Sequence, residues 1–130
     1  MMDDKLKCLF DYTKFHLGMY AALLTAIIGV FANNSLKDRY SHMVPFILAT
    51  VVFFLLAGVA GGLVASSIPG FSTFDDFCEA KLGPWNLKLV SGLTLTHIEH
   101  SAFWVGILAS IVGLFLTLLL PCGVMPQVGP

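Results

Sequence analysis

The stretch from Thr94 to Gly106, TLTHIEHSAFWVG, places two histidines and a glutamate at the start of a long apolar segment. His97, Glu99 and His100 are residue types that bind transition metals, ligate haem iron or carry protons. A third histidine, His16, stands at a comparable point before the first apolar segment. If both segments enter a membrane from the same side, these four side chains lie at one depth. One hypothesis is therefore a metal or haem site.

Helical geometry divides this cluster between two faces. At about 100° per residue, His97 and His100 project with Trp104 on a face of bulky side chains, whereas Glu99 projects among small residues. We therefore interpret the two histidines as interfacial residues beside an aromatic belt. Binding of haem, metal or quinone through His16, His97 and His100 is the alternative.

Lys14 is the basic residue that we expect beside Glu99. On a helical wheel of the first apolar segment, Lys14 projects toward the small residues, while His16 points away. A Lys14–Glu99 pair at the rim of a helix bundle would fix the helix register or gate a pore mouth.

The elements that position these residues are predicted to be membrane helices. The 130-residue chain is 57% hydrophobic and 12% charged, with a mean hydropathy of +0.85. Segments 17–32, 43–68 and 101–120 contain no Asp, Glu, Lys or Arg, and a helix of about 20 apolar residues spans the hydrocarbon core of a bilayer. The sequence therefore predicts an all-α integral membrane protein with three transmembrane helices in a small bundle, preceded by an amphipathic lead-in over residues 1–16.

A short amphipathic helix is expected between the second and third spans. The segment STFDDFCEAKLG opens with a capping-box pattern, either Ser72 with Asp75 or Thr73 with Asp76. A Gly-Pro pair follows it and would end the helix. We predict an interfacial helix over residues 72–83, lying on the membrane surface or capping the bundle.

Small residues recur along the spans, where they allow helices to approach closely. The residues predicted to lie at a packing interface, or along a pore, are Gly58, Gly61, Gly62, Gly106 and Gly113. These faces would hold the three helices together. Alternatively, the stripe in the second span would face another subunit or a solute pathway.

The distribution of basic residues predicts the orientation. With three spans, the amino-terminal segment and the second loop share one side and together carry five Lys residues, against Lys37 and Arg39 in the first loop. The positive-inside rule then places the amino terminus in the cytoplasm and the carboxyl terminus on the opposite side. Asp3, Asp4 and Asp11 argue against a cleaved signal peptide, so we expect the first span to be retained.

Charge and motifs exclude several classes of function. The net charge of −1 gives no basic surface for nucleic acid, and the three cysteines lack CxxC spacing. The chain has no GxSxG elbow and no phosphate-binding glycine loop. We predict a small, oligomeric, non-enzymatic membrane protein without a cofactor. Its partners would be the lipid bilayer and further copies or other subunits of a membrane complex, and it would act as such a subunit or as a channel.

Two alternatives rest on architecture. Three short spans with histidines resemble the haem- and quinone-binding membrane anchors of succinate dehydrogenase, which implies a redox anchor. The length and span count resemble three-span phage holins, which implies a membrane-disrupting effector. Neither family's motifs occur in the chain, so no residue role is transferred from them.

Overall fold

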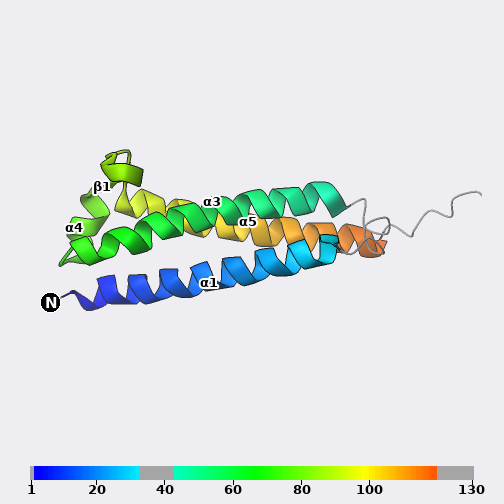
Figure 1. Cartoon of the computed structure of the whole chain (residues 1–130), viewed down its shortest axis with the longest axis horizontal. Helices are drawn as coiled ribbons and strands as arrows, with labels where there is room; N and C mark the ends of the chain where they lie inside the picture. Colours follow the sequence, from blue (N-terminus) through cyan, green and yellow to red (C-terminus); the bar gives the residue numbers. More distant parts are fainter. Residues whose placement is uncertain (1, 33–42, 120–130) are drawn as a thin grey trace, which may run out of the picture.

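A computed structural model describes residues 2–32 and 43–119 of the chain. Three long helices lie side by side: α1 (Asp4–Ala32), α3 (Val44–Ser67) and α5 (Gly92–Leu119). Helix α3 runs antiparallel to the other two (Figure 1). It packs most extensively against α5, and α1 lies along α3. The first loop, residues 33–42, and the tail, residues 120–130, are outside the described residues.

A compact segment joins α3 to α5 at the end of the bundle that also holds the amino terminus (Figure 1). Its elements are η2 (Ile68–Gly70), α4 (Phe74–Glu79), β1 (Lys81–Leu82), η3 (Pro84–Asn86) and β2 (Val90–Ser91). The two strands pair antiparallel, with the first residue of β1 opposite the last residue of β2. The Asp3 backbone N–H donates to the Ser72 carbonyl at 3.0 Å, which ties the start of α1 to this segment.

Local sequence explains where these helices begin. Pro45 stands in the first turn of α3, where its missing N–H costs no helical hydrogen bond. Thr73 caps α4, because its hydroxyl accepts a hydrogen bond from the Asp76 backbone N–H at 3.2 Å. At the start of α5, the Ser91 hydroxyl accepts from the Thr94 N–H at 3.2 Å. A Cβ on Gly92 would collide with the Phe77 carbonyl, so only glycine fits there.

The helix boundaries differ from the predicted ones at two places. Predicted span 43–68 matches α3 to within one residue at each end, and segment 17–32 is the second half of the single helix α1. Helix α5 begins nine residues before the predicted start at residue 101. Its first three turns therefore contain Glu99 and the two nearby histidines, which were predicted to lie outside the span.

The predicted interfacial helix over residues 72–83 is wrong in length. Helix α4 spans six residues, Phe74–Glu79, and of the two capping patterns the structure uses Thr73 with Asp76. After Ala80 the backbone is extended, and Lys81–Leu82 pairs with Val90–Ser91. This pairing satisfies backbone groups that a continued helix would have satisfied internally. The all-α prediction therefore missed a two-stranded sheet.

Trp85 stands at the tip of this segment with 92% of its surface exposed. Its backbone has φ 51° and ψ 39°, the left-handed region that a bulky residue rarely adopts. The structure thus holds a large aromatic side chain outside the packed bundle at a local conformational cost of about 1–2 kcal/mol.

Two apolar clusters form the core. The first, near the amino terminus, contains Leu6, Ala60, Val64, Ile68, Phe77 and Leu95. The second, further along the bundle, contains Tyr20, Phe54, Ala57, Ala102 and Phe103. Each cluster draws residues from α1, α3 and α5, so all three helices share one interior.

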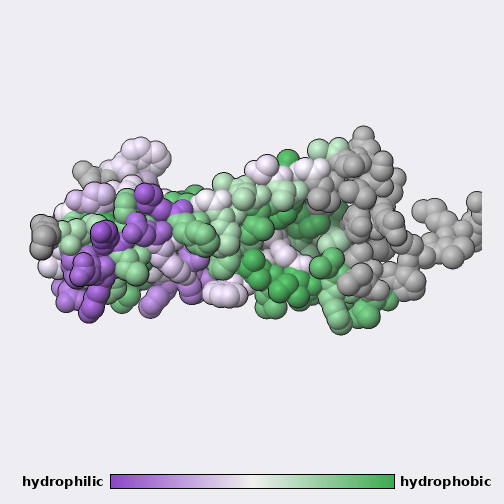
Figure 2. Space-filling view, turned by 90° about the horizontal axis from the view of Figure 1, so that it is seen from below, coloured by the Kyte–Doolittle hydropathy of each residue, from purple (hydrophilic) through white to green (hydrophobic). Residues whose placement is uncertain are grey.

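Two of the described helical stretches are long and apolar enough to cross a membrane, Val44–Gly70 and Gly92–Leu116. On the face shown in Figure 2, hydrophilic residues gather at the amino-terminal end, and hydrophobic residues cover the other half of the described surface. Large apolar side chains remain exposed along both stretches, among them Leu48, Val52, Val59, Leu108 and Ile111. Length and composition therefore support membrane insertion of α3 and α5.

Two cysteines provide a test of the packing of α4. Cys8 is exposed on α1, whereas Cys78 is partly buried against the first apolar cluster. Burial, with Asp75 and Glu79 nearby, raises the pKa of the Cys78 thiol, so less of it is thiolate at neutral pH. We expect maleimide to modify Cys8 several-fold faster than Cys78 in a Cys122→Ser background, as followed by mass spectrometry. Equal rates would contradict the packing of α4.

Candidate functional site

Glu99 lies where the three long helices meet. It belongs to α5, and none of its surface is exposed. The hydroxyl of Tyr20 on α1 donates a hydrogen bond to Glu99 Oε1 at 2.9 Å. On α3, Gly61 leaves room for the acid, since a Cβ there would lie 3.4 Å from Glu99 Cγ. A carboxyl group is thus enclosed by all three helices.

His16 on α1 is the basic residue beside this carboxyl group. Its Nδ1 lies 3.5 Å from Glu99 Oε1, and the side chain is buried. The ring of Tyr12 meets the imidazole edge to face at a centroid distance of 3.9 Å, and Phe103 stacks on it at 5.4 Å. Aromatic rings from α1 and α5 thus enclose the imidazole.

Three buried polar atoms have no hydrogen-bond partner among the described residues. They are Glu99 Oε2, His16 Nδ1 and Thr13 Oγ1. Most buried polar groups in proteins are hydrogen-bonded, so a cluster of exceptions points to a site rather than to simple packing. We call Thr13, His16 and Glu99 the polar layer; along each helix it lies between residues of the first and second apolar clusters.

His100 lies at the exposed edge of this layer. Trp104 Nε1 donates to His100 Nε2 at 3.2 Å, and Tyr12 Oη lies 2.8 Å from His100 Nδ1. Because an indole N–H is only a donor, Nε2 must be the acceptor, and His100 is therefore the neutral tautomer that donates from Nδ1 to Tyr12. Both ring nitrogens of His100 are engaged within the chain.

The structure places two of the three predicted ligand histidines, His16 and His100, near each other. His16 is buried, His97 is exposed, and the His16 and His100 rings lie 6.3 Å apart by centroid. Within residues 2–32 and 43–119, no group of three or more His, Cys, Asp or Glu side chains is placed to hold a metal ion. Ligation of haem through His100 would break its bonds to Tyr12 and Trp104.

The predicted Lys14–Glu99 pair is wrong in its basic partner. Lys14 is exposed, and its Nζ lies 5.0 Å from the centroid of the Phe10 ring. Among the described residues, the basic group within 4 Å of Glu99 is His16. The wheel placed Glu99 on the packing side, in agreement with its burial, but placed His16 on the wrong side of α1.

The five predicted interface glycines separate into two groups. A Cβ on Gly106 would lie 2.7 Å from the Phe54 ring, and one on Gly113 would lie 2.8 Å from Phe46 Cβ. Gly61 contacts the polar layer, as described above. A Cβ on Gly58 or Gly62 would meet nothing within 4 Å. Close contact with α3 thus explains Gly106 and Gly113 of α5, but the packing among the described residues does not require Gly58 or Gly62.

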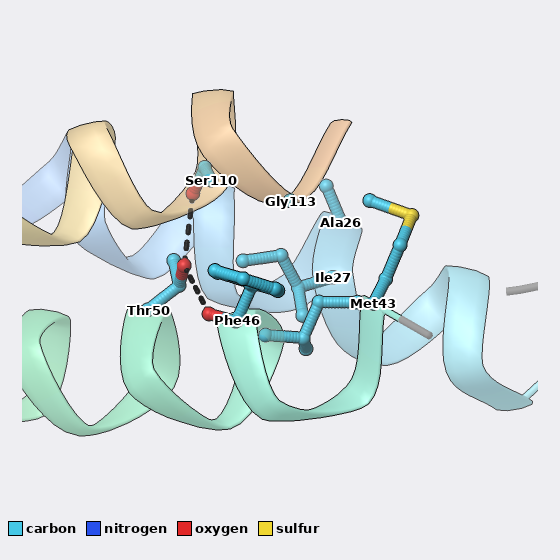
Figure 3. Close-up of a pocket in the computed structure, with 8 residues that line it drawn as sticks. Ala26, Ile27, Met43, Phe46, Thr50, Ser110 and Gly113 are labelled. Atoms are coloured by element: carbon cyan, nitrogen blue, oxygen red, sulfur yellow. Dashed lines mark hydrogen bonds between the residues drawn. The ribbon is translucent and has the colours of Figure 1, made fainter. Parts of the chain in front are cut away.

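A second polar contact joins α3 and α5 further along the bundle, beside a cavity of about 250 Å³ (Figure 3). The Thr50 and Ser110 hydroxyls are 3.0 Å apart, and Ser110 also donates to the Gly106 carbonyl at 3.0 Å. Ile27 of α1 and Phe46 of α3 line the cavity with these two residues. Its hydroxyl groups are already bonded within the chain, so the space offered to a ligand is largely apolar.

Sequence reasoning missed Thr13 and Tyr20 as members of the site. A signal was present, because Thr13, His16 and Tyr20 are spaced by three and four residues and therefore share one face of α1. Chemically, the arrangement can hold a proton on a carboxyl or an imidazole group inside a helix bundle.

Comparisons of the chain with models of protein families, with curated protein sequences and with solved structures gave no match.

Proposed function

We propose that this chain is a small, non-enzymatic integral membrane protein that acts as an assembling subunit of a membrane complex. In this proposal α1 is a third membrane helix beside α3 and α5, α4 lies at the interface, and the amino terminus is cytoplasmic. The observation that carries the proposal is the exposure of large apolar side chains along α3 and α5. Lipid or partner helices would cover them, because exposed apolar surface of this extent marks a membrane or protein contact.

The aromatic core favours an assembling subunit over a pore within one copy. Tyr20, Phe54 and Phe103 stack against one another, with ring centroids 5.5 to 6.1 Å apart, and each is at most 8% exposed. They fill the space between the three helices on the side of the polar layer that is farther from the amino terminus. A channel version of this function therefore requires a pathway between copies, with Gly58 and Gly62 as open positions at which another helix could approach.

Extraction and mass measurement test the proposal. We expect the full chain to remain in the membrane pellet after alkaline carbonate washing. In mild detergent it should elute as a particle containing at least two copies or a stoichiometric partner, as determined by light scattering. Release by carbonate would refute membrane insertion, and a monomer without a partner would refute the assembling role.

Native Cys8 reports the orientation. In a Cys78→Ser, Cys122→Ser background, we expect a membrane-impermeant maleimide to label intact cells only after permeabilisation. Labelling of Cys8 in intact cells would place the amino terminus on the outer side and contradict the proposed orientation.

A further inference from the structure

We propose that Glu99 and His16 together bind one exchangeable proton, and that release of this proton loosens α1 from α3 and α5. The proposal depends on packing within the chain and goes beyond the membrane function proposed above. Its geometric basis is a fully buried carboxyl group with one oxygen bonded to Tyr20 and the other oxygen without a partner.

The surroundings of Glu99 leave His16 as its charge partner. Helix α3 contributes Gly61 and has no ionisable residue between Val44 and Ser67. On α1, Tyr20 donates a hydrogen bond, and Lys14 is exposed. On α5, His97 is exposed, and His100 is bonded to Tyr12 and Trp104 outside the layer.

The proton count decides the charge of the layer. With one proton bound, Glu99 is a neutral carboxylic acid beside a neutral imidazole, and the net charge of the pair is zero. Release of that proton to solvent leaves a carboxylate, a neutral imidazole and a net charge of −1. An uncompensated charge between two apolar clusters is strongly unfavourable.

Helix α1 is the element that should respond. Close glycine contacts and the Thr50–Ser110 hydrogen bond hold α3 and α5 together. Among the described side chains, the polar contacts of α1 with α5 are those of Tyr20 and His16 with Glu99 and of Tyr12 with His100. Movement of α1 would let water reach the carboxylate. His100 and Tyr12, both exposed and both in ring contact with His16, mark the side from which a proton would enter.

Two measurements on the purified full chain in lipid nanodiscs test the proposal. Infrared difference spectra across a pH titration should show a protonated-carboxyl band that disappears as the pH rises. Glu99→Gln should abolish this band, and the control Glu79→Gln, at an exposed carboxyl group, should retain it. Electron-spin distances would be recorded between labels on Cys8 and Leu93→Cys in a Cys78→Ser, Cys122→Ser background. They should lengthen over the same pH range in the otherwise native chain and stay constant with Glu99→Gln.

His16→Gln keeps the proposal falsifiable if Glu99→Gln does not fold. Because His16 shares the proton, its loss should shift the pH at which the carboxyl band disappears. The proposal is overturned if no band depends on Glu99, if His16→Gln leaves the titration unchanged, or if the label distance does not change with pH.

Discussion

Replacing Gly106 by alanine should lower the free energy of unfolding by about 1–3 kcal/mol, the usual effect of overpacking a core. A Cβ at this position would lie 2.7 Å from two atoms of the Phe54 ring. Phe54 is only 1% exposed, and the rings of Tyr20 and Phe103 flank it at 6.1 Å each, so it has little room to move. Thermal or SDS denaturation in detergent would measure the loss.

Gly18→Ala is the matched control, since this glycine is also helical but a Cβ there would meet nothing within 4 Å among the described residues. We expect it to be neutral or to stabilise the chain by up to about 1 kcal/mol, because alanine is the better helix former. Equal destabilisation by both substitutions would contradict the close contact between α3 and α5.

Tyr20→Phe should also destabilise the chain by about 1–3 kcal/mol, because it leaves the buried Glu99 carboxyl group without its donor. The removed bond is 2.9 Å long, and both side chains are at most 2% exposed. Tyr12→Phe is the comparison, since its bond to His100 is exposed and its loss should cost less. The free energy of unfolding in detergent would again be the measurement.

A double-mutant cycle separates this bond from general packing. In a Glu99→Leu background the Tyr20 hydroxyl has no acceptor, so we expect Tyr20→Phe to become neutral or stabilising there. An unchanged cost of Tyr20→Phe in that background would show that the hydroxyl does not act through Glu99.

Composition was sufficient to locate the long helices, because uncharged apolar segments of this length have few alternatives to a membrane or core helix. Predicted span 43–68 and helix α3 differ by one residue at each end. The start of α5 could not be found in this way, because Glu99 interrupts the uncharged pattern that was used to define a span. The Glu99 carboxyl group is accommodated by contacts with Tyr20 and His16 of α1 that sequence periodicity does not reveal.

The polar layer could be predicted only in part. The helical wheel correctly predicted that Glu99 lies on the packing side of α5, because the small residues of α5 do face α3. For α1 the same rule failed, since a Cβ on Gly18 or Gly29 would meet nothing within 4 Å and the buried face instead carries Thr13, His16 and Tyr20. Small residues therefore marked the close helix pair but not the face through which α1 packs.

Cysteine accessibility along α3 tests membrane insertion most directly. Leu48, Val52, Leu55 and Val59 are each more than half exposed in the isolated chain, as is Trp85 at the tip of the connecting segment. Each would be replaced singly by cysteine in a chain whose three native cysteines are serine. The reagent, a hydrophilic maleimide, would be given access to both sides of native membranes. It should label position 85 and leave the four α3 positions unmodified until SDS is added. Labelling of the α3 positions as fast as position 85 before SDS addition would show that this face meets water, and would contradict a membrane-spanning α3.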